Sequence, residues 1–589
     1  MPGAYYADSV AAAAPNTPPT TPPLVLIAYS WGPKPKTPVT FTNAQNLVNA
    51  MRGAPGAAYV PFLSNPSPAL NGAQLVTLID PSESTQSFAS LSASGALGTQ
   101  SLLTSVLYGP PSNQLTEQVV SGSTAGLKLI LTDNYSGNQL VGDNLTVPFQ
   151  LAYSGAVSGQ TATYTVSGGA SGSFSVSGNG TYDTFTVPTM SGAYSTVSSL
   201  IEYLNGTGYY YAEPLSSTAG QLPCSLLTVT GGVALPAVSG STLQYVNVRA
   251  YLQDIAYWVN QFASTIATAA VSGSALDTAA WLPVTGATPT FFSGARGVPP
   301  TNADYASALN VALSTPGWTV FCDSNNAAVQ SLLAAHCEIA STAPYGQWRR
   351  GFTGSSIGDT QTFTQAAAIG LDSLQMAYLY PGIYRTNTVT GQNQLYGGLY
   401  AAAMAAGMAT GNPVATPLTN KTLNATGVEN ANAGAPLTQS QLSALQNAGV
   451  MAVWIPQSTG VPTILSDVTT WQVDNNPENT SSQQVACRYW LAYTMVNVLQ
   501  KYVGSIAYPT NEAIILNAAK SALNALIYTG GASNGVLAAW DTNSLQLVYT
   551  GANQTASITV NVQLVSQNKY ITVFASVLPL NFTISAATP

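Results

Sequence analysis

Charged side chains are scarce in this chain. Asp, Glu, Lys and Arg together make up 6% of its 589 residues, whereas ordinary soluble proteins carry about 25%. The 14 basic residues form no basic run and the net charge is −8, so we expect no binding to nucleic acid. A neutral surface of hydroxyl, amide and glycine residues offers little charge repulsion, and it therefore favours close contact with copies of the same chain.

Long apolar runs are also missing. The longest candidate near the start, LVLIAY from Leu24, is much shorter than the roughly 18 residues that a membrane helix needs. It follows a Pro-rich segment instead of a basic one, so the sequence indicates neither a signal peptide nor a membrane contact. We expect the protein to stay where it is made or to leave by lysis. The 31 Tyr, 14 Phe and 9 Trp indicate a folded chain and not a disordered one.

Catalytic patterns are absent as well. The sequence has one histidine, His336, and it contains no GxSxG, no GxGxxG after a strand and no GKS or GKT. His336 lies on the apolar side of a predicted helix, which favours a packed core histidine, although a Ser-His-Asp triad through it stays open. No motif selects a pair from the acidic candidates for glycoside hydrolysis. These candidates are Asp254, Asp277, Asp304, Asp323 and Glu338.

We therefore expect no enzyme, no catalytic residue, no cofactor and no metal site. The four cysteines, Cys224, Cys322, Cys337 and Cys487, show no CxxC or Cys/His metal spacing. A helix predicted between Cys322 and Cys337 would separate them by about 18 Å, beyond the roughly 7 Å that a disulfide allows. Buried free thiols are the expectation, and a disulfide between subunits is the alternative.

Alternating strands and helices fill the stretch from Gly317 to Arg385. An apolar strand precedes a helix with Val329, Leu332, Leu333 and His336 on one face. Strands are then predicted at 347–352 and within SLQMAYLYPGIYR, which ends at Pro381. Such an order predicts a mainly parallel sheet covered by helices.

Residues 130–240 have a different pattern. TATYTVSGGASGSFSVSGNGTYDTFTVP alternates apolar and polar residues between Gly-rich turns, which predicts an antiparallel sheet. Val197, Leu200, Ile201 and Leu204 predict one helix beside it. We interpret this part as an inserted outer domain, a decoration or else a receptor-binding or carbohydrate-binding module. A long helix that returns the chain to the core is then expected from the stripe of Val248, Leu252, Ile255, Val259, Phe262 and Ile266.

Both ends of the chain have the pattern of extended arms. Residues 1–22 finish in a Pro/Thr tract, which predicts an extended spacer, and the last residues form two strand candidates and a tail. Strands at chain ends can complete the sheet of a neighbour, the binding mode called β-augmentation. The candidate subunit-linking residues are Tyr5, Tyr6 and Val10 at the N-terminus and Tyr570, Val573 and Val577 at the C-terminus.

Local patterns also mark the region after the central sheet. GGLYAAAMAAGMATG is a helix of small residues, expected to be deeply buried or at a subunit contact. Thr438 and Gln441 have the spacing of a capping box, Leu442 and Leu445 face inward, and Gly449 can end that helix in the left-handed conformation.

The order of these segments resembles that of contractile bacteriophage tail sheath proteins. The turn Trp31-Gly32-Pro33 follows the first strand, and an Asn71-Gly72 turn precedes the strand of residues 75–79. LTQSQLSALQNAGVMAVWI, a helix with Arg488 near its start, and a helix ending at Gly530 and Gly531 resemble later segments of that family. The resemblance covers about three quarters of the chain and fails over the insert. The low charge and the last strand, which lacks the family's acidic residue after proline, also depart from the family.

The resemblance implies a multidomain α/β and α+β fold with a central α/β sheath core, an inserted β-rich domain and extended N- and C-terminal arms. The expected divisions are a linking arm (1–22), the first core part (23–129), the outer domain (130–240), the second core part (241–455), a C-terminal sheath domain (456–565) and a last strand with its arm (566–589).

The resemblance also implies a structural virion protein. Its subunits would form a helical stack of rings around a tail tube protein, between baseplate and tail terminator proteins, assembled in the host cytoplasm. Contraction would drive the tube through the host envelope during genome ejection. The alternative from composition is a surface-layer or adhesin-type structural protein, which would need an export signal and usually repeated β domains.

Overall fold

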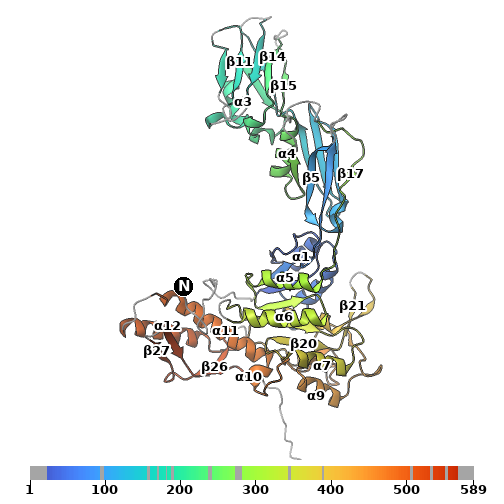
Figure 1. Cartoon of the computed structure of the whole chain (residues 1–589), viewed down its shortest axis with the longest axis vertical. Helices are drawn as coiled ribbons and strands as arrows, with labels where there is room; N and C mark the ends of the chain where they lie inside the picture. Colours follow the sequence, from blue (N-terminus) through green and yellow to red (C-terminus); the bar gives the residue numbers. More distant parts are fainter. Residues whose placement is uncertain are drawn as a thin grey trace, which may run out of the picture.

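The structure is a computed structural model of the whole chain. It describes residues 23–92, 99–155, 160–168, 172–180, 182–187, 192–236, 242–271, 282–342, 346–387, 390–504, 509–530, 535–550 and 555–567. The molecule is long: an α/β core and a C-terminal domain lie at one end, and the insert extends from the core as two β-rich domains in series (Figure 1).

The core is built on an eight-stranded sheet in the order β2-β3-β1-β18-β19-β20-β24-β25. All neighbours from β3 to β24 are parallel, and only the two outermost strands are antiparallel to theirs. The predicted parallel sheet is confirmed. Its strands are β1 (Leu24–Ile27), β2 (Val39–Phe41), β3 (Val76–Ile79), β18 (Thr319–Cys322), β19 (Arg350–Gly354), β20 (Met376–Tyr380), β24 (Val450–Trp454) and β25 (Thr463–Ile464).

Helices cover both faces of this sheet because its central strands are apolar on both sides. Leu24 and Leu26 of β1 face α1, α2 and α8, whereas Val25 and Ile27 face α5 and α6. Further along, α7 and α9 cover Tyr378 of β20. These helices are α1 (Ala44–Met51), α2 (Val60–Ser64), α5 (Asn302–Ala312), α6 (Ala327–Ala340), α7 (Gln361–Leu371), α8 (Gly398–Gly411) and α9 (Gln439–Asn447). A small sheet of β21 (Ile383–Thr386), β22 (Asn393–Tyr396) and β23 (Gly427–Val428) lies beside them.

Local predictions in the core are largely confirmed. The helix of small residues, α8, is buried along nearly its whole length. Thr438 and Gln441 form the capping box of α9, and Gly449 follows with a φ of 76°. The strand expected at 347–352 begins three residues later, at Arg350.

The inner insert domain consists of two sheets, β16-β5-β4 and β17-β6-β7-β8, packed on α4. Its elements are β4 (Gln86–Ser92), β5 (Thr99–Tyr108), β6 (Leu115–Ser121), β7 (Leu127–Asp133), β8 (Asn138–Leu145), α4 (Tyr251–Phe262), β16 (Ala267–Val271) and β17 (Thr290–Phe291). Leu115, Leu129 and Leu131 pack with Leu252 and Ile255 of α4, not with the parallel sheet. The described residues thus divide differently from the expected boundaries at 129 and 240, and the insert begins near residue 86.

The outer insert domain has the expected antiparallel strands and the expected helix. Its sheets are β12-β11-β10-β14 and β13-β9-β15, and all four residues of the predicted helical stripe are buried in α3. The elements are β9 (Phe149–Tyr153), β10 (Ala162–Val166), β11 (Phe174–Ser177), β12 (Phe185–Val187), α3 (Val197–Gly206), β13 (Tyr210–Pro214), β14 (Thr230–Leu235) and β15 (Val246–Val248).

The long helix expected from Val248 to Ile266 is shorter, and its predicted role is wrong. Val248 pairs with Phe149 in β15, and α4 ends before Ala263. Instead of leading directly into the core, α4 forms part of the inner insert domain.

The C-terminal domain packs on the core through an aromatic cluster that includes Trp318, Trp348 and Trp490. It contains two long helices and two two-stranded antiparallel sheets, β26-β29 and β27-β28. The elements are α10 (Pro477–Thr480), α11 (Ser482–Leu499), α12 (Pro509–Ala525), β26 (Leu537–Trp540), β27 (Gln546–Thr550), β28 (Thr555–Thr559) and β29 (Val562–Leu564). The last predicted strand, at 569–577, lies outside the described residues.

Candidate functional site

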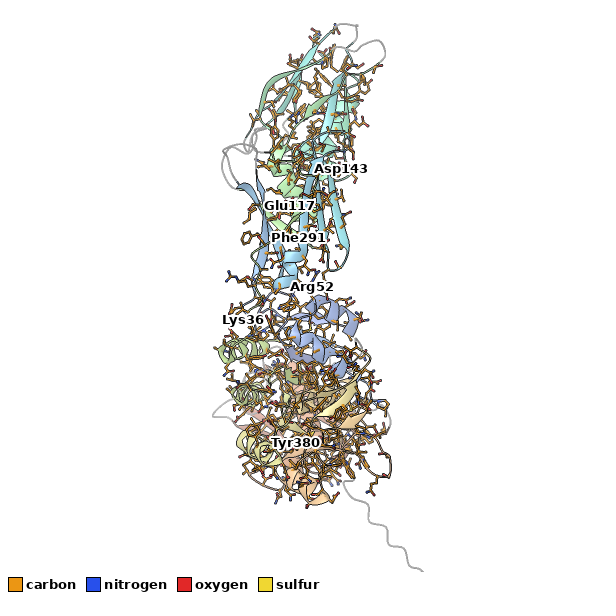
Figure 2. All side chains as sticks on the ribbon, turned by 90° about the vertical axis from the view of Figure 1, so that its right-hand side faces the viewer. Lys36, Arg52, Glu117, Asp143, Phe291 and Tyr380 are labelled. Carbon is orange, nitrogen blue, oxygen red and sulfur yellow. The ribbon has the colours of Figure 1, made fainter. Side chains whose placement is uncertain are left out.

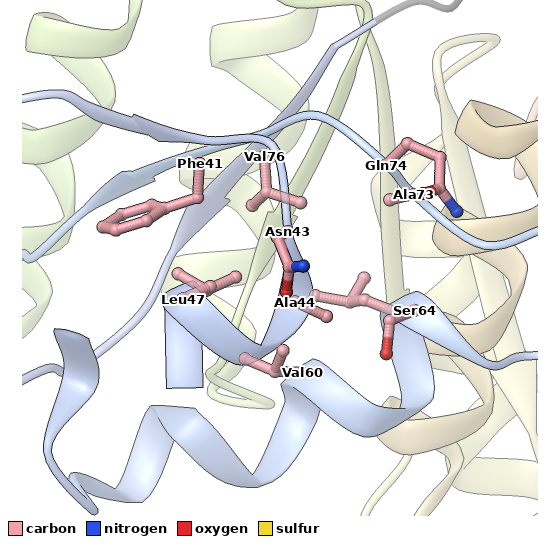
Figure 3. A pocket seen from close by; sticks show the side chains of 10 residues that line it. Phe41, Asn43, Ala44, Leu47, Val60, Ser64, Ala73, Gln74 and Val76 are labelled. Carbon is pink, nitrogen blue, oxygen red and sulfur yellow. The ribbon is translucent and has the colours of Figure 1, made fainter. Parts of the chain in front are cut away.

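Metal ligands do not gather in the described part of the chain, where no group of three or more His, Cys, Asp or Glu could hold an ion. A small pocket beside the edge strand β2 has a volume of about 10 Å³ and is lined by Phe41, Leu47, Val60 and Val76, among others (Figure 3). Such a volume holds about one water molecule. Among the described helices, none is long and apolar enough to cross a membrane.

His336 is a buried core histidine, as predicted. Its Nε2 accepts a hydrogen bond from Nη1 of Arg349 at 2.7 Å, because a guanidinium can only donate. Burial, and then the positive charge of Arg349, lower the pKa of His336 to about 3. The imidazole is therefore neutral at physiological pH. Arg349 itself is fully buried and also donates to the backbone carbonyls of Thr315 and Gly317.

Two carboxylates lie at the carboxyl ends of the parallel strands on either side of β1: Asp80, fully buried, follows β3, and Asp323, half-buried, follows β18. Asp80 accepts the backbone N–H of Ser30 at 3.2 Å and the Ser82 hydroxyl at 2.8 Å. Asp323 accepts the N–H of Tyr29 at 2.8 Å and the Tyr305 hydroxyl at 2.5 Å. Burial raises the pKa of each to about 6. Both carboxylates are used to hold the segment that follows β1, and this pair is a structural clamp.

The other acidic candidates in the described part of the chain lie on three different helices. Asp254 is buried in α4 and accepts the N–H of Thr146 at 2.6 Å. Asp304 forms a capping box with Thr301 at the start of α5. Glu338 is exposed on α6, and Asp277 lies outside the described residues.

All four cysteines are buried and free, as expected. Burial raises the pKa of Cys224, Cys337 and Cys487 to about 12. The thiols are thus protonated and shielded, because the reactive form of cysteine is the thiolate.

The predicted subunit-linking residues, Tyr5, Tyr6, Val10, Tyr570, Val573 and Val577, all lie outside the described residues. The structure does describe the two points at which the proposed arms begin. The N-terminal root is Pro23, whose carbonyl oxygen accepts the N–H of Trp318 at 3.0 Å. The C-terminal root is Gln567, whose side chain contacts Ser481 and Thr419.

Helix α11 connects the two roots. Trp318, next to the N-terminal root, packs against Trp490 and Tyr493 of α11 with ring centroids 4.8 and 5.0 Å apart. At the other root, Ser481 is the N-cap of the same helix. About nine residues separate Ser481 from Trp490, which corresponds to about 14 Å along a helix. Both arms therefore begin beside one rigid element.

The sheet β26-β29 has an open edge in the described part of the chain. Strand β29 pairs only with β26 there, and its Val562 and Leu564 pack on the aromatic cluster of the C-terminal domain. An edge strand presents unpaired N–H and C=O groups to which a further strand can bind. Just beyond this strand, the side chain of Gln483 on α11 donates to the carbonyl of Val565 at 3.1 Å.

Sequence reasoning missed Arg349, Asp80 and the role of Trp318. Asp80 follows an apolar strand directly, and that position was a usable signal for a side chain at the sheet edge. Nothing in the sequence distinguishes Arg349, which is fully buried, from Arg350, which is only partly buried.

No protein-family model and no curated protein matches the sequence. Among solved structures, the chain is similar to a sheath tail protein from Listeria innocua, with a TM-score of 0.55 and 10% identity over 94% of this chain and 93% of that one. A sheath tail protein from Desulfitobacterium hafniense gives 0.48 at 10% identity, over 94% and 100%. The contracted helical sheath of the anti-feeding prophage gives 0.35 at 12%, over 48% and 78%.

The similarity to the Listeria protein includes the insert as well as the core, since it covers nearly the whole of both chains. The expected multidomain α/β and α+β fold is confirmed by the sheet topology and by this likeness. The chain has the fold of a sheath tail protein.

Proposed function

We propose that this chain is a tail sheath subunit, a structural protein of the virion tail without enzymatic activity. The observation that carries the proposal is the match in fold to a sheath tail protein over 94% of the chain. A shared fold does not fix a function by itself, and the arrangement of the arm roots supplies the second support.

In the proposed assembly, subunits polymerise helically around a tail tube protein, between baseplate and tail terminator proteins, in the host cytoplasm. The arms, residues 1–22 and 566–589, bind neighbouring subunits by β-augmentation. The open edge of β29 is a suitable acceptor, because no described strand pairs with β29 on the side away from β26. Both roots lie beside α11, so a pull on either arm acts on the same helix.

Contraction follows in this proposal when a signal from the baseplate lets subunits rotate and move outward while their arms stay bound. The extended sheath is metastable, and additional buried surface in the contracted state provides the free energy. That free energy drives the tube through the host envelope during genome ejection.

The test is electron microscopy of the purified chain in negative stain, beside variants that lack residues 1–22 or 568–589. We expect hollow tubes or stacked rings from the full chain and their loss in each truncation. Monodisperse monomers under all conditions would contradict the proposal and favour an adhesin, and flat two-dimensional lattices would favour a surface layer.

A point substitution makes the test sharper. Gln567→Ala keeps the C-terminal arm but removes the hydrogen bonds of the Gln567 side chain with Ser481 and Thr419. We therefore expect fewer or shorter tubes. Gln439→Ala is the matched control, because Gln439 is an exposed glutamine on α9, away from both roots and from β29. Equal tube formation by both variants would show that the root does not matter for linking.

A further inference from the structure

The insert joins the core through a narrow neck, which we define as residues 80–86 and 293–301 together with the segment 29–36. Lys36 and Arg52 lie at this narrow part, between the core and the inner insert domain (Figure 2). The segment that enters the insert and the segment that leaves it are hydrogen-bonded to each other: the N–H of Thr85 donates to the carbonyl of Arg296 at 3.0 Å. Gly32 and Tyr108 exchange two backbone hydrogen bonds of 2.8 and 3.1 Å.

A buried ion pair forms the first clamp across the neck. Arg52 caps α1 of the core with a left-handed backbone, and its guanidinium binds both carboxylate oxygens of Asp133 at 2.8 and 2.5 Å. Asp133 is the last residue of β7 in the insert, and its side chain is 4% exposed. The guanidinium also lies 5.1 Å from the ring centre of Tyr135. Two-point binding of this kind fixes direction as well as distance.

The charge balance of the first clamp is consistent with a persistent pair. Burial raises the pKa of Asp133, but the hydrogen bonds from Arg52 and Ser136 and the charge of Arg52 outweigh it, so that this pKa lies below its usual value. The carboxylate therefore stays ionised through the physiological range.

A second clamp lies in the neck around Lys36. Its ammonium group forms two ion pairs. One partner is Glu83, in the segment that leads from the core into the insert, and the other is Asp304 at the start of α5, with 3.2 Å between Nζ of Lys36 and Oδ1 of Asp304. The Glu83 side chain is 61% exposed, so salt screens this clamp much more than the first.

The placement of charge in this chain supports a special role for the neck. Only 36 residues carry a charge, 14 basic and 22 acidic. Among the described residues, four ion pairs are found and three of them involve Lys36 or Arg52. The fourth, Lys128 with Asp143, lies inside the insert. A chain that otherwise avoids charge concentrates its pairs where two of its parts meet.

Tight packing accompanies the clamps. A Cβ atom on Gly109 would lie 2.5 Å from the Trp31 ring, and one on Gly297 would lie 2.7 Å from the Tyr29 hydroxyl. Side chains of the segment after β1 thus pack directly against the backbone at Gly109 and Gly297.

We propose that the neck is a two-part electrostatic latch that holds the insert on the core as a rigid lever. The buried Arg52–Asp133 pair sets the angle of the insert at any salt concentration, and the exposed Lys36 cluster adds a part that salt can release. The latch belongs to the single chain and does not depend on the proposed sheath function.

The test is double electron–electron resonance between spin labels on Ser331→Cys of α6 and Ser121→Cys at the end of β6. Both serines are exposed, and the four native thiols are buried. For the otherwise unchanged chain, we expect one narrow distribution of distances between the two labels at about 0.1 M and at about 1 M NaCl. Between these salt concentrations the electrostatic screening length falls from about 10 Å to about 3 Å.

Arg52→Met removes the buried clamp. We expect a distribution about twofold wider, as for a mobile domain joint, with further widening when salt releases Lys36. Lys128→Met, which removes the ion pair inside the insert, is the matched control and stays narrow. Circular dichroism melts check that each variant is folded, and Asp133→Asn replaces Arg52→Met if that variant fails to fold. A broad distribution in the unchanged chain, or a narrow one in both Arg52→Met and Asp133→Asn, would overturn the proposal.

Discussion

Gly407 of α8 lies against the backbone of Leu63 in α2, so closely that a Cβ on the glycine would stand 2.2 Å from the Leu63 carbonyl oxygen. Two helices can approach this far only when one of them presents no side chain at the contact. The buried helix of small residues therefore sets the distance between two layers of the core, and its composition is explained by packing within one chain.

Gly407→Ala should destabilise the chain by about 1–3 kcal/mol, the usual cost of overpacking a core. Gly370→Ala is the matched control, since Gly370 is also helical, in α7, and a Cβ added there would have no atom within 4 Å. Alanine should raise the stability there by up to about 1 kcal/mol. Urea unfolding of the two variants measures the difference, and equal effects would refute the packing argument.

The buried pair of His336 and Arg349 predicts unequal effects of two substitutions. His336→Leu leaves Nη1 of Arg349 without an acceptor inside the core, at a cost of about 1–3 kcal/mol. His336→Gln can offer its amide oxygen to the same N–H, so we expect a smaller loss in the free energy of unfolding. If the leucine variant were as stable as the glutamine variant, the hydrogen bond would not matter.

Asp254 predicts a pH dependence of stability. Burial raises its pKa from 3.8 to about 7 in the folded chain, so the folded state holds a proton that the unfolded state releases between about pH 4 and 7. The contribution of Asp254 to the free energy of unfolding therefore falls as the pH rises through that range.

Asp254→Asn removes this titration. The free energy of unfolding of Asp254→Asn, measured relative to that of the unchanged chain, should be higher at pH 8 than at pH 5. The expected increase is a few kcal/mol, since each pKa unit corresponds to about 1.4 kcal/mol. Asp304→Asn is the control, because hydrogen bonds with Thr301 lower the pKa of Asp304. Asp304 is therefore ionised in both the folded and the unfolded chain at pH 5 and at pH 8, and the stability difference between Asp304→Asn and the unchanged chain should be the same at the two pH values. Denaturant unfolding at both pH values measures the effect, and a constant difference between Asp254→Asn and the unchanged chain would contradict the assignment.

Gly449, between α9 and β24, combines a left-handed backbone with a close contact. Its φ is 76°, and a Cβ would lie 2.6 Å from the Thr469 carbonyl oxygen. Gly460 has a similar φ of 67° with no atom near a Cβ. Alanine at 460 should cost about 1 kcal/mol from backbone strain alone, and alanine at 449 should cost more. Thermal melts of the two variants separate strain from contact.

Salt tolerance of assembled tubes tests the charge-poor surface within the proposed function. With 6% charged residues, contacts between subunits should depend on apolar burial and neutral hydrogen bonds, which salt screens little. Tubes should therefore persist at about 1 M NaCl, where the screening length is about 3 Å. Turbidity and microscopy across a salt series provide the measurement, and dissolution at high salt would show that charge holds the subunits together.

Local structure could be predicted where a residue pattern depends only on near neighbours. The four apolar residues from Val197 to Leu204 lie buried on one face of α3, and Thr438 caps α9 with Gln441. Helix periodicity and capping act within one or two turns, so the sequence carries them directly.

Long-range pairing could not be predicted in the same way. Strand β7, from Leu127, alternates buried and half-buried residues as any half-covered strand does, and nothing local shows that its partners are β6 and β8 instead of the core sheet. Val248 and Ile266 fit the helical spacing of α4, but neither belongs to it. Val248 pairs with Phe149 in a sheet, and α4 ends at its C-cap, Ala263, before Ile266. The polar side chains that hold the neck, Arg52 and Asp133, are 81 positions apart in the sequence.

The hydrogen bond between Thr85 and Arg296 has a consequence for how such a chain could arise. These residues are the two ends of the insert, and they lie side by side where the chain leaves the core and where it returns. For the parallel sheet, the whole insert therefore occupies the place of a surface turn between β3 and α5. Closing a long connection costs little more entropy than closing a short one, so the core can exchange one outer module for another while its own folding stays the same.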